Sequence, residues 1–153
     1  MRLMLLFCLL FPCTLLATPD TFILLRHAEK KAGPNPSLTI AGNERAVRIS
    51  QLLKNYDIKH IFSSNYNRTL ETAKPLAKRL GITVTHYNPR ELSALVRQLD
   101  TLSGTAVIIG HSNTTPELVK RLSNEQVAIN EDQFDHLFIV QKGVLSIQSS
   151  NPE

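Results

Sequence analysis

The sequence predicts an α/β fold in which helices cover a mostly parallel β-sheet. Short apolar runs alternate along the chain with longer segments of helical periodicity. Several of these runs are apolar throughout, as strands buried on both faces are. The 153 residues are 42% hydrophobic and 20% charged, which suits one domain with a substantial core. We find no internal repeat and no sign of a second folded domain.

The first seventeen residues differ from the rest of the chain and are typical of a secretory signal. Arg2 precedes an apolar stretch that Ala17 closes, the order of charged, hydrophobic and cleavage regions in such signals. The stretch is shorter than the roughly 20 apolar residues of a membrane-spanning helix, and Pro12 interrupts it. An uncleaved N-terminal anchor is the alternative. We therefore predict a signal peptide over 1–17, one domain over 18–153, and a periplasmic or secreted protein.

Both cysteines of the chain, Cys8 and Cys13, lie within the predicted signal. The mature protein would then have no disulfide, no thiol nucleophile and no zinc–thiolate site. The spacings typical of metal hydrolases, such as H-E-x-x-H, do not occur in the sequence. We therefore expect neither a metal nor another cofactor.

The charge of the chain favours a small anionic ligand. Seventeen Lys and Arg residues against thirteen Asp and Glu give a formal charge of +4. The excess is small, and its members do not form a basic stripe interleaved with aromatic residues. This distribution argues against nucleic acid as a partner.

The apolar runs that we expect to be strands follow one another at 22–25, 60–63, 83–87, 105–109, 137–140 and 144–147. Helical faces recur between them at 46–56, 68–80, 92–99 and 118–122. The second helix should stop at Gly81, and Pro75 should kink or restart it. Gln141-Lys142-Gly143 predicts a hairpin turn, and therefore antiparallel pairing at one edge of the sheet. The long irregular stretch at 29–38 is typical of a functional loop.

Three of the predicted strands end at chemically capable side chains. The first strand runs into Arg26 and His27, the strand at 105–109 runs into His111, and Arg68 opens the helix after the strand at 60–63. Parallel strands finish at one edge of a sheet, and ligands bind in the crevice outside their carboxyl ends. Two imidazoles and two guanidiniums in one crevice would suit a compact polyanion such as phosphate.

At these residues the sequence resembles the histidine phosphatase superfamily, the phosphoglycerate-mutase-like group, branch 1. LRHAEK is similar to the family's Arg-His-Gly signature, with Ala28 where glycine is usual. FSSNYNRTLETA resembles the signature of the phosphate-binding arginine, GHSNTTPEL the segment of the second histidine, and LTIAGNERA the linker helix. The resemblance implies a three-layer α/β/α sandwich with a mostly parallel central sheet. The absence of a large insertion points to the small phosphatases of the group.

The resemblance also implies roles for particular residues. His27 would attack phosphorus and become a phosphohistidine, which water then hydrolyses. The phosphoryl oxygens would be held by Arg26, Arg68 and His111. The family uses a carboxylic acid to protonate the leaving oxygen. Glu91 stands where small members place it, while Glu29 and Glu117 remain open.

The expected activity is therefore a metal-independent phosphomonoesterase that acts on an extracytoplasmic substrate. Its partner would be a small phosphorylated molecule. We expect no nucleic acid and no stable membrane association once the leader is removed.

Two other functions remain open on the sequence. VIIGHSNT resembles the nucleophile elbow of a serine esterase, with Ser112 as nucleophile and with Asp132 or Asp135 followed by His136 in the right order. Thr114 stands where the elbow needs a second glycine, and this proposal leaves the two arginines unexplained. The other alternative is a phosphate-binding module without turnover.

Overall fold

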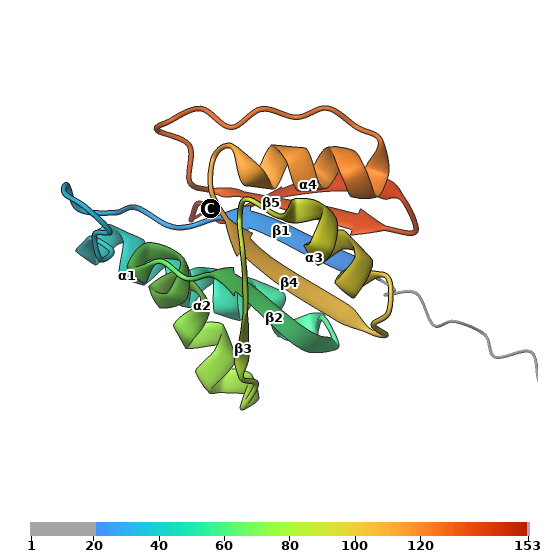
Figure 1. The fold of residues 1–153 in the computed structure, drawn as a ribbon. Coiled ribbons are helices and arrows are strands. Elements are labelled where there is room, and N and C mark those ends of the chain that lie inside the picture. Colours follow the sequence, from blue (N-terminus) through green and yellow to red (C-terminus); the bar gives the residue numbers. More distant parts are fainter. Residues whose placement is uncertain (1–20, 153) are drawn as a thin grey trace, which may run out of the picture.

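The chain is described by a computed structural model that covers residues 21–152. The predicted signal at 1–17 lies outside these residues. Six strands form one sheet in the order β3-β2-β4-β1-β5-β6 (Figure 1). Their bounds are β1 (Thr21–Arg26), β2 (Ile58–Ser64), β3 (Val84–Tyr87), β4 (Thr105–Gly110), β5 (His136–Gln141) and β6 (Val144–Ser149).

The sheet is mostly parallel, as predicted. Strands β3, β2, β4 and β1 run in one direction, whereas β5 is antiparallel to β1 and β6 is antiparallel to β5. The turn between β5 and β6 places Lys142 at φ 50° and Gly143 at φ 78°. Positive φ at both central residues gives a two-residue turn whose twist suits a hairpin.

Two pairs of helices cover the two faces of the sheet. The helices are α1 (Ile40–Leu52), extended by the 3₁₀ turn η1 (Leu53–Asn55), α2 (Asn67–Leu80), α3 (Leu92–Leu99) and α4 (Thr114–Ser123). Ile23 and Leu25 of β1 pack in the core cluster that includes α1 and α2, and Leu24 packs in the cluster that includes α3 and α4. This alternation gives the three-layer α/β/α sandwich that was predicted.

Helix α2 ends where the sequence predicts but is not divided at its proline. Gly81 lies in the left-handed region at φ 67° and caps the helix, and its N–H donates to Ala77 O. The helix continues through Pro75 as one element, so of the two expected effects, a kink or a restart, the restart does not occur. Ala73 and Leu76 on either side of the proline are buried in the core, and this packing offsets the backbone hydrogen bond that Pro75 cannot donate.

Helix α1 begins against the segment that leaves β1. Thr39 accepts a hydrogen bond from Gly42 N at 3.0 Å and donates its own N–H to Glu29 O at 2.9 Å. A Cβ at position 42 would lie only 2.1 Å from Glu29 O. Glycine therefore lets the helix approach the backbone within three residues of His27.

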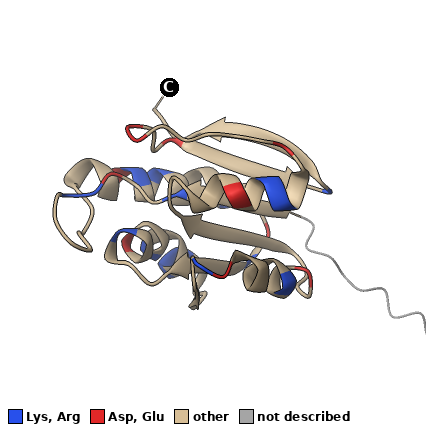
Figure 2. Ribbon diagram, turned by 45° about the horizontal axis from the view of Figure 1, so that its top comes forward, with Lys and Arg blue, Asp and Glu red and all other residues tan. Residues whose placement is uncertain are grey.

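No helix within residues 21–152 is long and apolar enough to cross a membrane. Figure 2 shows Lys and Arg residues on several helices and loops, with acidic residues between them. The charge is therefore distributed over the fold as the sequence suggested.

Candidate active site

The carboxyl ends of three neighbouring strands bring the predicted site residues together. β4 lies between β1 and β2, and Arg26 at the end of β1 is in register with Gly110 at the end of β4. His27 N donates to Gly110 O at 3.0 Å, which continues the ladder by one bond. His111, which follows Gly110, therefore lies between the residue that ends β1 and Arg68 in the first turn of α2.

His27 is almost fully buried and has one ring nitrogen fixed by the backbone. Its side chain is 3% exposed, and Nδ1 lies 2.8 Å from Ala28 O. A carbonyl oxygen only accepts hydrogen bonds, so Nδ1 carries the proton and donates it to Ala28 O. The other nitrogen, Nε2, then holds a lone pair.

Burial also keeps the imidazole of His27 neutral. Burial is the main cause that lowers its pKa from 6.5 to about 4; the bond to Ala28 O opposes the shift, and the charges of Arg26 and Arg68 add to it. A neutral imidazole with a defined tautomer is the form of histidine that can act as a nucleophile.

Arg26 contacts backbone carbonyls, an aromatic ring and a carboxylate, and it is 4% exposed. Its Nη1 donates to the carbonyls of Asn130, Glu131 and Gln133 at 2.9, 2.9 and 3.1 Å. Its guanidinium lies over the ring of Phe134, 4.2 Å from the centroid. Nη2 lies 3.2 Å from Glu131 Oε2. Burial lowers the pKa of Arg26, and Glu131 opposes this shift, so the guanidinium remains charged at neutral pH.

Arg68 and His111 form a second unit of the site. Arg68 lies over the ring of Tyr66, 4.6 Å from the centroid, and its Nη2 is 3.4 Å from His111 Nδ1. Since Arg68 can only donate, Nδ1 accepts and His111 Nε2 donates to Ser64 Oγ at 2.9 Å. Burial, followed by the charges of Arg68 and Arg26, lowers the pKa of His111 to about 4. Both histidines of the site are therefore neutral at pH 7.

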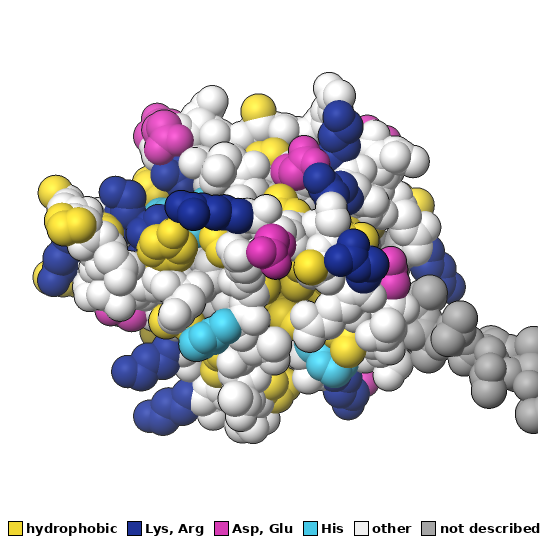
Figure 3. All heavy atoms as spheres, viewed as in Figure 1, with side chains coloured by type: hydrophobic (Ala, Val, Ile, Leu, Met, Phe, Trp, Pro, Cys, Tyr) yellow, Lys and Arg dark blue, Asp and Glu magenta, His cyan; other side chains and the backbone are white. Residues whose placement is uncertain are grey.

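These side chains line a pocket of about 340 Å³. In Figure 3, basic side chains gather at the left of the view, where β1 and β4 end in Figure 1. The lining consists of Arg26, His27, Lys30, Tyr66, Arg68, Pro89, Arg90, His111, Ser112, Asn113, Thr114 and Glu131. The pocket is therefore strongly cationic, with one carboxylate among the described lining residues.

Two donors of this pocket have no partner within the described residues. Nε of Arg26 and Nε of Arg68 are buried and make no hydrogen bond. Burial of an unpaired cationic donor is costly. An oxyanion bound between the two arginines could accept hydrogen bonds from both Nε groups, so these unpaired donors are consistent with an oxyanion pocket.

Ala28 does not disturb the site. Its backbone does not adopt positive φ, so glycine is not required there. Its methyl group packs in a small cluster with Leu38 and Ala46. Its N–H donates to Thr72 Oγ1 at 3.0 Å while its carbonyl orients His27.

None of the three carboxylates suggested by the sequence lines the pocket. Glu91 is exposed at the N-cap of α3. Glu29 forms a bidentate ion pair with Arg45, with a shortest distance of 2.7 Å. Glu117 pairs with Arg121 at 2.8 Å. The carboxylate that does lie in the lining is that of Glu131.

The arrangement needed for a serine esterase is not assembled. Ser112 lines the pocket, but its Oγ donates to Glu131 Oε1 at 3.1 Å. The His136 ring is hydrogen-bonded by Gln133. Asp135 instead accepts from the C-terminal segment. No histidine in the described part of the chain is hydrogen-bonded to Ser112 Oγ.

Metal ligands are likewise not grouped: residues 21–152 contain no cluster of three or more His, Cys, Asp or Glu side chains placed to hold an ion.

Sequence reasoning missed the two aromatic supports and the pocket carboxylate. Tyr66 could have been suspected, because it lies two residues before Arg68 within the same motif. Phe134 and Glu131 belong to an irregular segment before β5 that carries no recognisable pattern. Only the folded chain brings them to Arg26.

Comparison with known proteins agrees with this geometry. The family model of the histidine phosphatase superfamily (branch 1) matches residues 22–91, and no curated protein matches the sequence. Among solved structures, the putative phosphohistidine phosphatase SixA from Agrobacterium tumefaciens has a TM-score of 0.64 at 17% identity, covering 86% of this chain and 97% of that one.

Two further structures show the same fold. A putative alpha-ribazole-5'-P phosphatase from Escherichia coli has a TM-score of 0.65 at 14% identity, covering 88% of this chain and 97% of that one. A phosphoglycerate mutase from Bacillus anthracis has a TM-score of 0.67 at 13% identity, covering 88% and 93%. The family match contains both Arg26-His27 and Arg68. The segment at 22–91, with Arg26, His27 and Arg68, is therefore that of the histidine phosphatase superfamily, branch 1, and the fold of the chain is shared with phosphatases and a phosphoglycerate mutase.

Proposed function

We propose that this protein is a metal-independent phosphomonoesterase that works through a phosphohistidine on His27 and acts on an extracytoplasmic phosphorylated substrate. The observation that carries this proposal is the hydrogen bond from His27 Nδ1 to Ala28 O. It leaves Nε2 as the free, unprotonated nitrogen in a pocket lined by cations.

The first chemical step forms a bond between His27 Nε2 and phosphorus. The bond from phosphorus to the ester oxygen breaks on the opposite side, and its electron pair leaves with that oxygen. Arg26 and Arg68 offset the negative charge of the phosphoryl oxygens, and the dianion raises the pKa of His111 so that it can donate a proton toward it. In the second step, water attacks phosphorus and releases inorganic phosphate and the neutral imidazole.

The departing oxygen needs a proton when it would otherwise leave as an alkoxide. Glu91 remains our proposed donor on the basis of its motif. Glu131 is the alternative that the pocket suggests, because it is the carboxylate in the described lining. The two can be separated by substitution with glutamine.

A trapping experiment tests the nucleophile. The enzyme is mixed with a ³²P-labelled phosphomonoester and the reaction is quenched rapidly without acid. The phosphoenzyme that is trapped should be labile to acid and stable to base, as a phosphoramidate is. His27→Ala should abolish both label and turnover, whereas His86→Ala, at an exposed position on β3, should retain both. Label that persists in His27→Ala would refute the assignment.

Ser112→Ala should keep substantial activity, which separates the phosphatase from an esterase. EDTA should leave turnover unchanged, and a loss that added metal restores would contradict the metal-free mechanism. Binding of phosphate without any turnover would support the non-catalytic module instead.

Leaving-group dependence tests the proton donor. General acids contribute about 10² to 10⁴ in rate, and the effect is large only for poor leaving groups. Removing the true donor should therefore slow alkyl phosphates far more than nitrophenyl phosphate. If Glu91→Gln slows both equally and Glu131→Gln shows the selective loss, the role belongs to Glu131.

Export is supported by the order of charged, apolar and small residues in the first seventeen positions. N-terminal sequencing of the protein isolated from its native host should find a mature chain that begins near Thr18. Recovery of a full-length cytoplasmic product would contradict the proposed localisation.

A further inference from the structure

Two basic side chains in the pocket are not used by the proposed chemistry. Lys30 and Arg90 both line the pocket, and both are exposed. Within residues 21–152, neither lies within ion-pair distance of a carboxylate. Other cations of the chain, such as Arg45 and Arg121, are paired. The two side chains therefore present charge to the pocket rather than to a neighbour in the fold.

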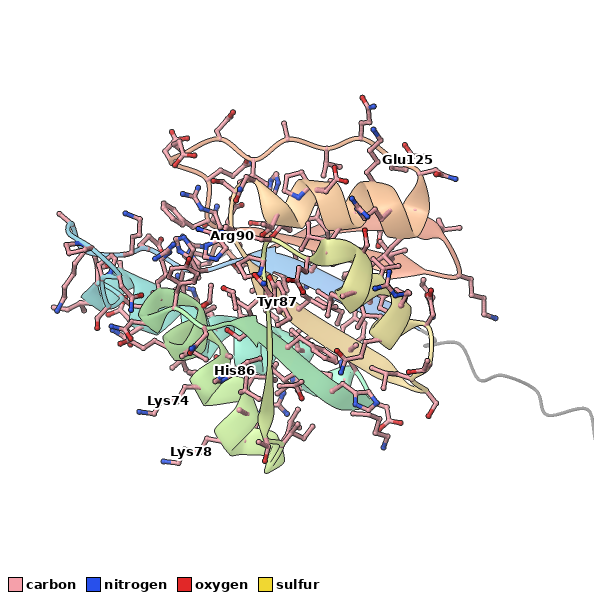
Figure 4. All side chains as sticks on the ribbon, in the orientation of Figure 1. Lys74, Lys78, His86, Tyr87, Arg90 and Glu125 are labelled. Atoms are coloured by element: carbon pink, nitrogen blue, oxygen red, sulfur yellow. The ribbon has the colours of Figure 1, made fainter. Side chains whose placement is uncertain are left out.

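A tight turn presents Arg90 to the pocket. Glu91 N donates to Asn88 O at 3.0 Å, and Arg90 N donates to Asn88 Oδ1 at 3.1 Å. Asn88 and Pro89 thus occupy the first two positions of a turn that both residues favour. Pro89 also lines the pocket. In Figure 4, Arg90 lies beyond Tyr87, on the segment that connects β3 to α3.

Lys30 lies on a segment that leads to α1, on the face of the sheet opposite to α3. It lies on the segment from β1 to α1, where a bridge to Leu38 and a hydrogen bond from Lys31 N to Ser37 O pin the base of the loop. Arg90 precedes α3, which covers the opposite face. Two separately fixed turns therefore bring a cation to the pocket from the two faces of the sheet.

The charge and volume of the pocket exceed what one phosphoryl group needs. Four cations face one carboxylate, since both histidines have pKa values of about 4. A bound phosphoryl dianion still leaves one positive charge without a partner. The pocket of about 340 Å³ is also about ten times the ~30 Å³ share of one water molecule in the liquid, and it is the size at which small-molecule sites begin.

We propose that Lys30 and Arg90 form a second anion subsite, so that the preferred substrates are small phosphomonoesters with a further anionic group, a carboxylate or a second phosphate. This inference rests on the proposed phosphatase function and adds the substrate class. Arg90 offers a planar fork that suits either group, and Lys30 offers a point charge.

Paired substrates test the subsite. Phosphoglycolate is compared with ethyl phosphate for a carboxylate, and propane-1,3-diol bisphosphate with the monophosphate for a second phosphate. We expect kcat/KM to favour at least one of the doubly anionic probes by about three- to tenfold at low salt, and the preference to shrink as salt rises, because the side chains are exposed. The pair that shows the larger preference identifies the group.

The variants are Lys30→Gln, Arg90→Gln and the double substitution, with Lys78→Gln as the matched control. Lys78 is exposed on α2, and Figure 4 shows it far from Arg90. The double variant should lose the preference, because turnover of the doubly anionic probe falls further than turnover of its singly anionic partner, and the control should keep the preference. No preference in the wild type, or a preference that survives the double substitution, would overturn the proposal.

Equilibrium binding separates this inference from the proposed function. In a His27→Ala background, which cannot form the phosphoenzyme, calorimetry with the same probes should show the same preference and the same loss in the double variant. Absence of turnover with every probe in the wild type would refute the phosphatase proposal, whereas equal affinity for phosphoglycolate, the bisphosphate and their singly anionic partners would refute the subsite.

Discussion

The neutral state of His27 is the most direct test of the site, since the proposed chemistry requires an unprotonated imidazole. Burial lowers its pKa from 6.5 to about 4. At pH 5.5 an unshifted histidine would be about nine-tenths protonated, whereas a group with a pKa of about 4 would be protonated in only ~3% of molecules. The expected difference in protonation is therefore large at pH 5.5.

The measurement is an NMR titration of the imidazole Cε1–H resonances between pH 4 and 8. Comparison with His27→Gln assigns the resonance of His27. The resonance should show no inflection near pH 6.5 in the free protein. Inorganic phosphate should raise the midpoint, because an anion beside the ring favours the protonated form. A midpoint near 6.5 in the free, folded protein would refute the argument from burial.

Three further predictions concern electrostatics and packing. Glu131→Gln removes a carboxylate that competes for Arg26, so calorimetry at low salt should show phosphate binding tighter by up to about fivefold, as expected for an exposed ion pair worth no more than ~1 kcal/mol; weaker binding would contradict this. Gly42→Ala should lower the free energy of unfolding in urea by about 1–3 kcal/mol through overlap at the site of close approach, although alanine in a helix otherwise gains ~1 kcal/mol over glycine; a more stable variant would contradict the close packing. Because the folded pKa values of His27 and His111 are about 4 and the unfolded values are near 6.5, the unfolded chain binds more protons between these limits, and stability should fall as the pH falls through this window. Urea titrations at pH 7 and pH 5 should show a smaller fall when both histidines are replaced by glutamine, and an equal fall would show that neither contributes.

Much of the fold could be predicted because its signals are local. The strand at 105–109 is rich in β-branched residues and has no charged residue, and in the structure β4 is buried along its whole length. The short segment Gln141-Lys142-Gly143 between two apolar runs predicted the hairpin, and in the structure Lys142 and Gly143 adopt the positive φ that such a turn requires. The continuity of α2 through Pro75 could not be predicted in this way, since Ala73 and Leu76 on either side of the proline are buried through tertiary packing.

The convergence of Arg26, His27, Arg68 and His111 could be predicted because each residue lies at or shortly after the carboxyl end of a parallel strand. The proton donor could not be placed in this way. Arg90 and Glu91 are adjacent in sequence, yet the turn at Asn88 puts only Arg90 in the pocket lining. A sequence motif does not specify which of two adjacent residues in a turn faces the pocket.

The hydrogen bonds of Arg26 bear on how substitutions at this position should be interpreted. Its Nη1 donates hydrogen bonds to three backbone carbonyls of the segment before β5, which lies more than 100 residues further along the chain. Selection for folding and selection for turnover therefore act on the same guanidinium. A lysine has the charge but no second nitrogen that could reach Glu131 while the first holds the three carbonyls. An inactive Arg26 variant would therefore have lost both a phosphate-binding side chain and the anchor of the segment before β5. An activity assay alone would not separate these two effects.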